Sequence, residues 1–335
     1  MPRFLIIQTA FIGDVVLATA LAEKLHKHYP EAVIDFLVRK GNEHLLHQHP
    51  YIHSVLVWDK QSNKHLNLAR IIRQVRRNHY DFVINPHRFA TSGLITMLSG
   101  ATERRGFDKN PFAFGFSRKI PHPIRKTGEK AVHEVERNQM LIADITDQVP
   151  SRPALYPSEA DVASVQKYAG GSYICIAPTS VWYTKQYPVD RWIDLINRLP
   201  ASHSIYLLGA PSDTSVANEI LHQSSHSKVV NLCGQLTFLQ SAALMRHAEM
   251  NYVNDSAPMH FASAVNAPVT AVFCSTVPAF GFGPLSDQSE VVEIDYDLYC
   301  RPCGLHGYKT CPEGHFKCAR DINQDQFLWW ISKKI

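Results

Sequence analysis

The feature that most constrains the fold is an alternation of short β-rich runs with longer stretches of helical periodicity, which occurs in both halves of the chain. This alternation is typical of parallel sheets covered by helices, so the sequence predicts an α/β fold. Strands are expected at residues 3–8, 32–38, 54–58, 80–84, 173–177, 204–208, 228–232, 250–253 and 269–273. Helices are expected at residues 14–28, 189–198, 215–222, 239–247 and 259–265.

The two halves are separated by a polar stretch rich in Pro at residues 150–157. A length of 335 residues is sufficient for two domains. The economical interpretation is two Rossmann-like domains facing a cleft, at residues 1–155 and 165–320. The final segment, residues 321–335, is rich in apolar and aromatic side chains, and we expect it to form a helix that packs back on the first domain.

Composition and charge exclude several classes of protein. Hydrophobic residues make up 45% of the chain and charged residues 19%, which excludes intrinsic disorder. A net charge of +4 is too small to make nucleic acid the expected partner. We find neither an apolar run of the roughly 18 residues that span a bilayer nor a signal peptide, so a cytoplasmic location is expected.

The first loop predicts a ligand site. The expected strand 3–8 leads through Gly13 to Asp14 at the start of a helix, and ligands bind at this edge of a doubly wound sheet. Gly13 permits close backbone approach, whereas Asp14 is either a reactive carboxylate or only a helix N-cap. The loop has neither G-x-G-x-x-G nor a Walker A pattern, which disfavours dehydrogenases, NAD-dependent epimerases and P-loop kinases.

Three loops in the second half offer groups for a diphosphate. The first carries the hydroxyls of Thr179 and Ser180 and the ammonium of Lys185, although a lone Lys is more often a solvated surface residue. The other two loops carry Asp213 and the run Asn254-Asp255-Ser256-Ala257-Pro258-Met259-His260. In the alternative interpretation, Asp255 or Ser256 only caps a helix and His260 is an ordinary partly buried histidine.

Taken together, these motifs resemble one enzyme family. Residues 13–20, 180–188 and 254–260, with Ala267-Pro268-Val269 after them, are similar in order and spacing to the ADP-heptose:lipopolysaccharide heptosyltransferases of glycosyltransferase family 9. The chain looks most similar to the heptosyltransferase II branch, which also tends to carry a cysteine-rich C-terminal segment. The resemblance implies a GT-B fold, with the acceptor on the first domain and the nucleotide sugar on the second.

The implied reaction is an inverting, metal-independent transfer of heptose from ADP-L-glycero-D-manno-heptose to the inner core of lipopolysaccharide, with no cofactor required. Carried over by position, Asp14 would be the general base and Lys185 would neutralise the departing diphosphate. The other implied donor contacts are Thr179 and Ser180 to phosphate, Asp213 to the ribose side, and Asp255, Ser256, Ala257 and His260 to the sugar and phosphates. Two departures are Ala257, where the family commonly has Gly, and Gln186-Tyr187, where it has Arg-Trp.

A basic stretch at residues 101–130 holds eight basic and three acidic residues, a local net charge of +5, interleaved with Phe side chains. An anionic glycolipid of the Kdo-lipid A type would be attracted by this mixture, so we expect Arg104, Arg105 and Gly13 to bind the acceptor at the inner-leaflet membrane surface. The enzyme would then be peripheral at the inner membrane. In the alternative, the stretch is a solvated loop with its Phe side chains in the core.

The C-terminal region contains Cys300, Cys303, Cys311 and Cys318, in the pattern C-x2-C-x7-C-x6-C. Four cysteines within 19 residues are sufficient for a tetrahedral structural Zn²⁺, although only one pair has the usual spacing. Reduced packing cysteines and a disulfide are the alternatives. For the whole chain, the rival functions are a GT-B transferase with another sugar or acceptor, and a noncatalytic protein that binds a sugar nucleotide or glycolipid.

Overall fold

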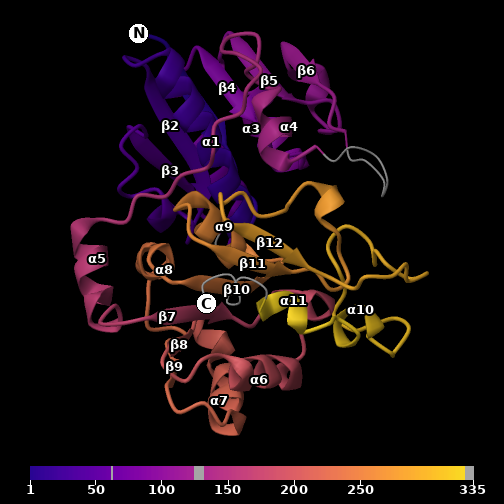
Figure 1. The fold of residues 1–335 in the computed structure, drawn as a ribbon. Helices are drawn as coiled ribbons and strands as arrows, with labels where there is room; N and C mark the ends of the chain where they lie inside the picture. Colours follow the sequence, from indigo (N-terminus) through magenta and orange to yellow (C-terminus); the bar gives the residue numbers. More distant parts are fainter. Residues whose placement is uncertain (62, 124–131, 329–335) are drawn as a thin grey trace. The chain divides into compact units, whose positions relative to one another are not determined.

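The computed structural model describes residues 1–61, 63–123 and 132–328. The described residues divide into two compact units, which meet in sequence between Tyr156 and Pro157 (Figure 1). Each unit is built on its own six-stranded parallel sheet. Among the helices of the described residues, none combines the length and the hydropathy that crossing a bilayer requires.

The first unit has the strand order β3-β2-β1-β4-β5-β6. Its strands are β1 (Arg3–Ile7), β2 (Val33–Arg39), β3 (Ser54–Trp58), β4 (Phe82–Asn85), β5 (Glu103–Phe107) and β6 (Arg118–Ile120). Its helices are α1 (Ile12–His28), α2 (Lys64–Arg77), α3 (Ala90–Met97) and α4 (Glu134–Gln139). Helix α1 packs on β1 and β2, whereas α2 packs on β3 and α3 packs on β4 and β5.

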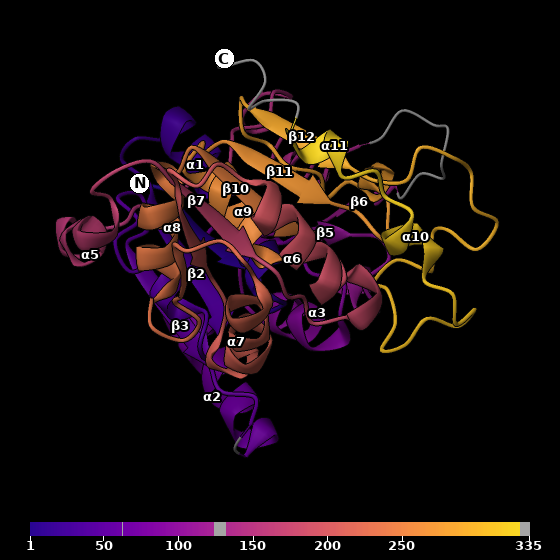
Figure 2. The same ribbon diagram turned by 60° about the horizontal axis from the view of Figure 1, so that its bottom comes forward.

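The second unit has the strand order β12-β11-β10-β7-β8-β9, and β12, β11, β10 and β7 can be followed side by side in Figure 2. Its strands are β7 (Tyr173–Ala177), β8 (Ser204–Leu207), β9 (Val229–Asn231), β10 (Met250–Asn254), β11 (Val269–Val272) and β12 (Ser289–Val292). Its helices are α5 (Glu159–Val165), α6 (Val189–Arg198), α7 (Thr214–Gln223), α8 (Phe238–Arg246), α9 (Ala257–Ala264), α10 (Lys317–Arg320) and α11 (Asp325–Leu328).

Both sheets follow the same rule of strand order. When the strands of each unit are counted in chain order, the sequence across each sheet is 3-2-1-4-5-6, the order of a Rossmann fold. The order reverses between β1 and β4 in the first unit and between β7 and β10 in the second. Ligands of such sheets bind outside the carboxyl ends of the strands at this reversal, so these two points are where a site is expected.

Hydrophobic burial explains why the sequence forms these two sheets. Residues Phe4 to Ile7 of β1 and Ile174 to Ile176 of β7 are almost fully buried, as expected for central parallel strands covered on both faces. The first unit has a core cluster that includes Trp58, Ile71 and Val75. A separate cluster in the second unit surrounds Trp192. Each unit therefore has its own hydrophobic core.

The basic stretch differs from its predicted form, because residues 103–107 and 118–120 are strands β5 and β6 of the first sheet. Arg105 is only 3% exposed, and its guanidinium lies 2.6 Å from Asp144 and 3.3 Å from Glu103. Arg104 donates to the carbonyl oxygens of Gly115 and Ala101. These two side chains are occupied inside the unit, so the prediction that they bind an acceptor at the surface is wrong for Arg105 and unsupported for Arg104. Residues 124–131 of the stretch lie outside the described residues.

The C-terminal segment also differs from its prediction. Its described part, through Leu328, belongs to the second unit, where Phe327 is fully buried in the core beside Trp192. The hydroxyl of Tyr252 donates to the Phe327 carbonyl oxygen at 2.9 Å, and the Gln324 amide donates to the Arg191 carbonyl oxygen at 2.7 Å. The expectation that this segment packs on the first domain is therefore wrong for residues 321–328, and residues 329–335 lie outside the described residues.

Candidate active-site residues

In the second unit, Asn254 connects the loop after β10 to the loop after β7, at the point where the strand order reverses. It is the last residue of β10 and is fully buried. Its side-chain oxygen accepts from the Tyr187 backbone N–H at 2.9 Å, and its amide nitrogen donates to the Ala177 carbonyl oxygen at 3.4 Å. The loop that follows β7 is thereby fixed beside the loop that follows β10, which carries the predicted donor-binding residues.

Lys185 and Asp255 form an ion pair at this point. The Lys185 ammonium lies 2.7 Å from Asp255 Oδ2, and both side chains are largely buried. The hydroxyl of Thr276 donates to the same carboxylate oxygen at 2.7 Å. The alternative of a solvated surface Lys at position 185 is therefore wrong. A buried ion pair that also receives a hydrogen bond holds both partners in a defined geometry.

The segment that follows Cys300 contacts the Lys185 loop directly. The Tyr308 backbone N–H donates to Thr184 Oγ1 at 2.7 Å, and the Thr184 N–H donates to the Tyr308 carbonyl oxygen at 3.1 Å. Thr184 Oγ1 also lies 3.0 Å from Ser275 Oγ. Gly307, the residue before Tyr308, has φ +75. A Cβ added at Gly307 would lie 2.8 Å from Thr184 Oγ1. Only glycine fits this close approach with that backbone conformation.

Arg301 holds the loop that follows β11. Its guanidinium donates to the carbonyl oxygens of Phe273, Cys274 and Thr276 at 3.2, 2.7 and 2.8 Å, and to Glu293 Oε2 at 2.5 Å. The side chain is 9% exposed. Thr276 in turn contacts Asp255, so Arg301 supports the Lys185–Asp255 pair indirectly, through Thr276. Sequence reasoning missed this role. The one sequence feature that could have indicated this role is the presence of an Arg between Cys300 and Pro302, in a turn rich in Pro and Cys.

The remaining predicted donor-side residues have mixed surroundings. Thr179 and Ser180 are partly exposed in the loop after β7. Ser256 is the N-cap residue of α9, but its hydroxyl donates to the Asn254 carbonyl oxygen rather than capping the helix. Ala257 begins α9, and His260, one turn later, is 5% exposed.

Asp213 has a local structural role. Its carboxylate accepts from the Ala210 N–H at 2.8 Å and closes the turn before α7. Among the described residues, no hydrogen bond or ion pair joins Asp213 to Lys185 or Asp255. The predicted contact of Asp213 with ribose remains a prediction.

In the first unit, Gly13 and Asp14 are the second and third residues of α1, and both are partly exposed. The N-cap position belongs to Phe11, so the alternative that Asp14 is the N-cap is wrong. A carboxylate in the first turn lies at the positive end of the helix dipole, which favours its negative charge. Asp14 therefore lies in the first turn of α1, at the reversal point of the first sheet.

Sequence reasoning missed two groups at the same edge. Lys60, which follows β3, donates to the Thr9 carbonyl oxygen at 2.7 Å, and Thr9 Oγ1 lies 3.3 Å from Nδ1 of His87, which follows β4. Burial, with the charges of Lys60 and Arg88, lowers the pKa of His87 to about 3. Burial, with the nearby Arg39 and Lys64, lowers the pKa of Lys60 to about 8. Perturbed groups of this kind often mark functional sites.

Two exposed aromatic side chains flank these groups. Phe11 is 58% exposed and lies under the guanidinium of Arg39, and Phe89 is 66% exposed with its ring 4.5 Å from that of His87. Large apolar side chains left in solvent beside polar groups are typical of a binding surface. This edge of the first unit can therefore offer a carboxylate, an ammonium and apolar faces to a ligand.

The cysteine region gives the zinc prediction no support. All seven cysteines are free thiols, and the described residues hold no group of three or more His, Cys, Asp and Glu side chains that could bind a metal ion. Cys300 Sγ lies 3.9 Å from His315 Nε2, and Cys303 Sγ donates to the Cys300 carbonyl oxygen. Cys318 is buried in the core of the second unit, in agreement with the alternative of reduced packing cysteines.

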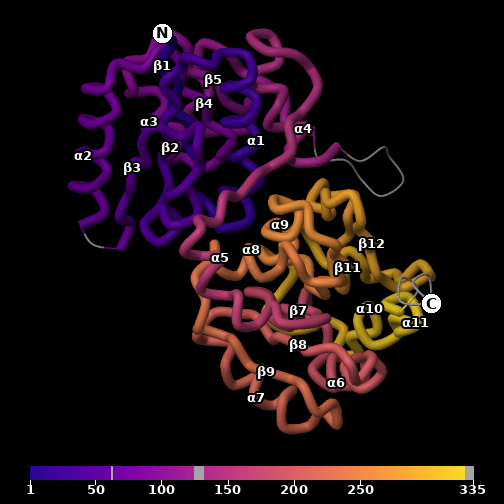
Figure 3. The backbone as a smooth tube through the Cα atoms, turned by 60° about the vertical axis from the view of Figure 1, so that its left-hand side comes forward, coloured from indigo at the N-terminus to yellow at the C-terminus, as the bar shows by residue number. Residues whose placement is uncertain are grey.

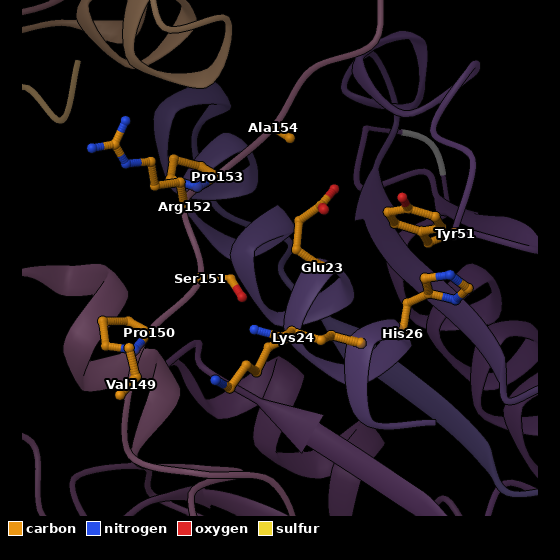
Figure 4. A pocket seen from close by; sticks show the side chains of 11 residues that line it. Glu23, Lys24, His26, Tyr51, Val149, Pro150, Ser151, Arg152, Pro153 and Ala154 are labelled. Atoms are coloured by element: carbon orange, nitrogen blue, oxygen red, sulfur yellow. The ribbon is translucent and has the colours of Figure 1, made fainter. Parts of the chain in front are cut away.

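A groove of about 590 Å³ in the first unit lies elsewhere, between α1 and residues 149–154 (Figure 4). Three of its polar side chains have partners within the unit: Lys24 pairs with Asp147, Glu23 accepts from the Tyr156 hydroxyl, and His26 stacks on Tyr51. None of the predicted site residues lines it. We assign this groove no part of the candidate site.

Comparison with known proteins gives one family and one fold. The family described as glycosyltransferase family 9 (heptosyltransferase) matches residues 68–313. A lipopolysaccharide heptosyltransferase 3 of Escherichia coli is 28% identical and covers 79% of this chain and 82% of its own length. Lipopolysaccharide heptosyltransferase 2 of E. coli K12 is 24% identical and covers 97% of this chain and 96% of its own length.

Solved structures agree with the fold. The E. coli ADP-heptose lps heptosyltransferase II superposes with a TM-score of 0.80 at 20% identity, covering 99% of this chain and 98% of that chain. The E. coli heptosyltransferase WaaC with ADP-2-deoxy-2-fluoro heptose gives a TM-score of 0.74 at 17% identity, covering 99% and 100%. Two six-stranded parallel sheets of Rossmann order are shared with these GT-B enzymes, so the predicted fold class is confirmed.

Proposed function

Because the chain belongs to glycosyltransferase family 9, the heptosyltransferases, we propose that it transfers heptose from ADP-L-glycero-D-manno-heptose to the inner core of lipopolysaccharide. The family match over residues 68–313 is the observation that carries this proposal. Relatives named lipopolysaccharide heptosyltransferase support the sugar and the class of acceptor. The complex of WaaC with ADP-2-deoxy-2-fluoro heptose supports an ADP-linked donor.

The proposed acceptor is a Kdo-lipid A type core that already carries one heptose. The heptosyltransferases 2 and II, which match almost the whole chain, favour this acceptor and the assignment to that branch. A core with further heptose is the second candidate, favoured by the higher identity to a heptosyltransferase 3. Comparing turnover of the two core fragments distinguishes them.

The two units divide the chemistry in this proposal, with the acceptor on the first and the donor on the second. Asp14 removes the proton of the acceptor hydroxyl as its oxygen attacks the anomeric carbon, opposite the leaving group. The bond from that carbon to the ADP oxygen breaks, and its electron pair goes to the diphosphate. Attack from the opposite face inverts the anomeric configuration.

Lys185 neutralises the charge that develops on the diphosphate. An ammonium has three N–H donors, and the bond to Asp255 uses one, which leaves donors for phosphate oxygens. Asp255 thereby orients the ammonium and can also meet the sugar, as the family resemblance implies. The loop with Thr179 and Ser180 and the N-terminus of α9 add neutral donors. This arrangement supports leaving-group stabilisation by the protein alone, without a metal ion.

The site of action follows from the acceptor. A glycolipid acceptor is held in a bilayer, and we propose that the enzyme works as a peripheral protein on the cytoplasmic face of the inner membrane. The rival functions remain testable. A panel of ADP- and UDP-sugars separates the heptose donor from other sugars, and product formation separates an enzyme from a noncatalytic binding protein.

The direct test is turnover by the purified protein of ADP-heptose and a core fragment in EDTA, measured as ADP release. Asp14→Asn should lower kcat by about 10² to 10⁴ with ADP affinity unchanged, because the base is lost and the donor unit is untouched. The matched control is Asp190→Asn, an exposed carboxylate in the first turn of α6. Full kcat in Asp14→Asn would contradict the assigned base, and ADP binding without product would favour the noncatalytic rival.

A further inference from the structure

Helix α2 of the first unit is strongly basic and contains no acidic residue. Over 14 residues it carries one Lys, four Arg and one His, at positions 64, 70, 73, 76, 77 and 65. Ordinary surface helices mix both signs of charge, which allows pairs to form along the helix. The uniform positive charge of α2 is therefore a feature that its fold does not require.

The two faces of α2 are sharply divided. Ile71 and Val75 are buried in the core of the first unit, with Leu68 and Ile72 packed beside them. The opposite face repeats at spacings of three and four residues and presents Leu66, Arg70, Arg73 and Arg77. The three arginines are exposed, and Leu66 is 67% exposed. This outward stripe, defined by those four residues, combines three cations with one apolar side chain.

Within the described residues, no ion pair connects α2 to an acidic side chain. Arg70 and Arg73 are three residues apart and Arg73 and Arg77 are four, so like charges face each other along the stripe. Such pairs destabilise a helix unless an external anion neutralises them. An anionic partner outside the unit would relieve this repulsion.

The position of α2 connects the stripe to the acceptor side. The helix begins just after Lys60, at the carboxyl edge of the sheet where Thr9, Asp14 and His87 lie, and Asn67 Nδ2 donates to the Asp59 carbonyl oxygen at 3.3 Å. In Figure 3 α2 runs along the side of the first unit next to β3. The N-terminal end of the stripe, at Leu66, therefore lies near this edge.

We propose that the outward stripe of α2 docks the enzyme on a bilayer that contains anionic phospholipids. A flat anionic surface can meet all three arginines at once, and Leu66 can enter the headgroup region. The inference rests on the proposed function, since a lipid-linked acceptor must be reached at a membrane. It assigns this contact to α2, in place of the residue 101–130 stretch whose Arg105 is buried.

The test compares binding of the full-length protein to vesicles of phosphatidylcholine alone and of phosphatidylcholine with phosphatidylglycerol, by co-sedimentation. Binding should require the anionic lipid and weaken on addition of about 0.5 M salt. Each basic residue near an anionic surface strengthens binding roughly five-fold, so the triple variant Arg70→Gln, Arg73→Gln, Arg77→Gln should bind on the order of 100-fold more weakly. Gln keeps helix propensity close to that of Arg.

The matched control replaces Lys27, Lys167 and Lys228 by Gln, which removes the same charge from exposed positions outside α2. It should keep most of the binding. The α2 variant should remain at least as stable to urea as the parent protein, because like-charge pairs are removed. Its kcat/KM should fall for acceptor embedded in anionic vesicles and stay unchanged for a water-soluble core fragment.

Each outcome decides a separate point. Equal binding of the α2 variant and the parent protein to anionic vesicles, or no binding by the parent protein, overturns the docking proposal. Binding of a short DNA duplex without binding of vesicles also overturns it and assigns the stripe to a nucleic acid. Failure to turn over the soluble core fragment rejects the proposed function instead, whatever the vesicles show.

Discussion

At the carboxyl edge of the first sheet, His87 is buried next to Thr9, and the folded protein keeps its imidazole neutral. Protonation of His87 would bury a charge and place a third positive charge beside those of Lys60 and Arg88. Such a group adds a pH-dependent term to stability, because the unfolded chain can protonate the same histidine in water.

The sign of this effect is fixed by the pKa of His87, about 3 in the folded protein against an ordinary value of 6.5. Between these values the unfolded chain binds a proton that the folded protein does not, so stability falls as pH decreases from about 6.5 towards 3. His87→Asn should flatten the slope of unfolding free energy between about pH 6 and pH 4 by about 1 kcal/mol per pH unit. Urea unfolding across this range measures it.

The control for that prediction is His79→Asn. His79 is exposed with φ 48, a conformation that Asn accepts well, so its slope should stay that of the parent protein. The slope matters here rather than the absolute stability, which any change in packing at position 87 can lower. An unchanged slope in His87→Asn would show that His87 is protonated in the folded protein.

The sequence names candidate reactive residues but not the residues that contact them. Asp14 and Lys185 are candidates because each follows a predicted strand, and strand ends are where ligands bind in parallel sheets. The bond between Lys185 and Asp255 depends on β7 and β10 being neighbours, across 70 residues of chain. Lys60 and His87 belong to no motif, and only the packing of the fold gives them their shifted pKa values.

At the scale of elements, the turn that follows Cys300 supports the donor loops. Arg301 donates to three backbone carbonyl oxygens around Cys274, and Gly307 lies against Thr184 and Lys185. Neither residue reaches a substrate in the proposed mechanism. Both set the position of the Lys185 ammonium through the loops they contact.

Arg301→Ala should lower kcat/KM for the ADP-sugar by about 10- to 100-fold with the acceptor KM unchanged, because loss of the buried hydrogen bonds costs about 1–3 kcal/mol and releases the loop after β11. Arg301→Lys should restore part of the rate, since it keeps the charge but not the planar donors. Gly307→Ala should act in the same direction, as its Cβ would lie 3.0 Å from Lys185 Cγ. Steady-state kinetics with each substrate varied in turn measures these effects.

The control is Arg320→Ala in the adjoining α10, an exposed arginine that pairs with Asp190 on the surface. Surface pairs contribute little, so its kinetics should match those of the parent protein. Equal losses in donor and acceptor KM for Arg301→Ala would indicate general destabilisation and contradict a positioning role.

Element prediction succeeded where hydrophobic burial alone decides the structure. β3, β7 and α6 have the predicted bounds, because each has an apolar pattern that the core selects. β5 was missed because its sequence begins Glu-Arg-Arg, and charges of that kind enter a sheet only when tertiary partners such as Asp144 neutralise them. The same absence of tertiary information placed residues 321–328 on the wrong domain.

For the whole molecule, the presence of two Rossmann-like units with separate cores means that a ligand of one unit can stabilise that unit more than the other. The two units have separate cores, and the Lys185–Asp255 pair and Asp14 belong to different units. If the donor binds only to the second unit, its binding free energy stabilises that unit first. A ligand at 100 times its Kd adds about 2.7 kcal/mol to the stability of the part that binds it.

Hydrogen exchange in the presence of ADP tests whether the donor binds to the second unit alone. ADP should slow the exchange of backbone amides in the loop after β7 and at the start of α9. At about 100 times the Kd of ADP, the rate should fall by up to about 100-fold for amides that exchange only after ADP has dissociated. Amides at the start of α1 should respond to a core-fragment acceptor instead. UDP at the same concentration should protect less, since the donor is ADP-linked in the proposed reaction. Protection by ADP confined to the first unit would reverse the assignment of the two substrates and remove Lys185 from the leaving-group site.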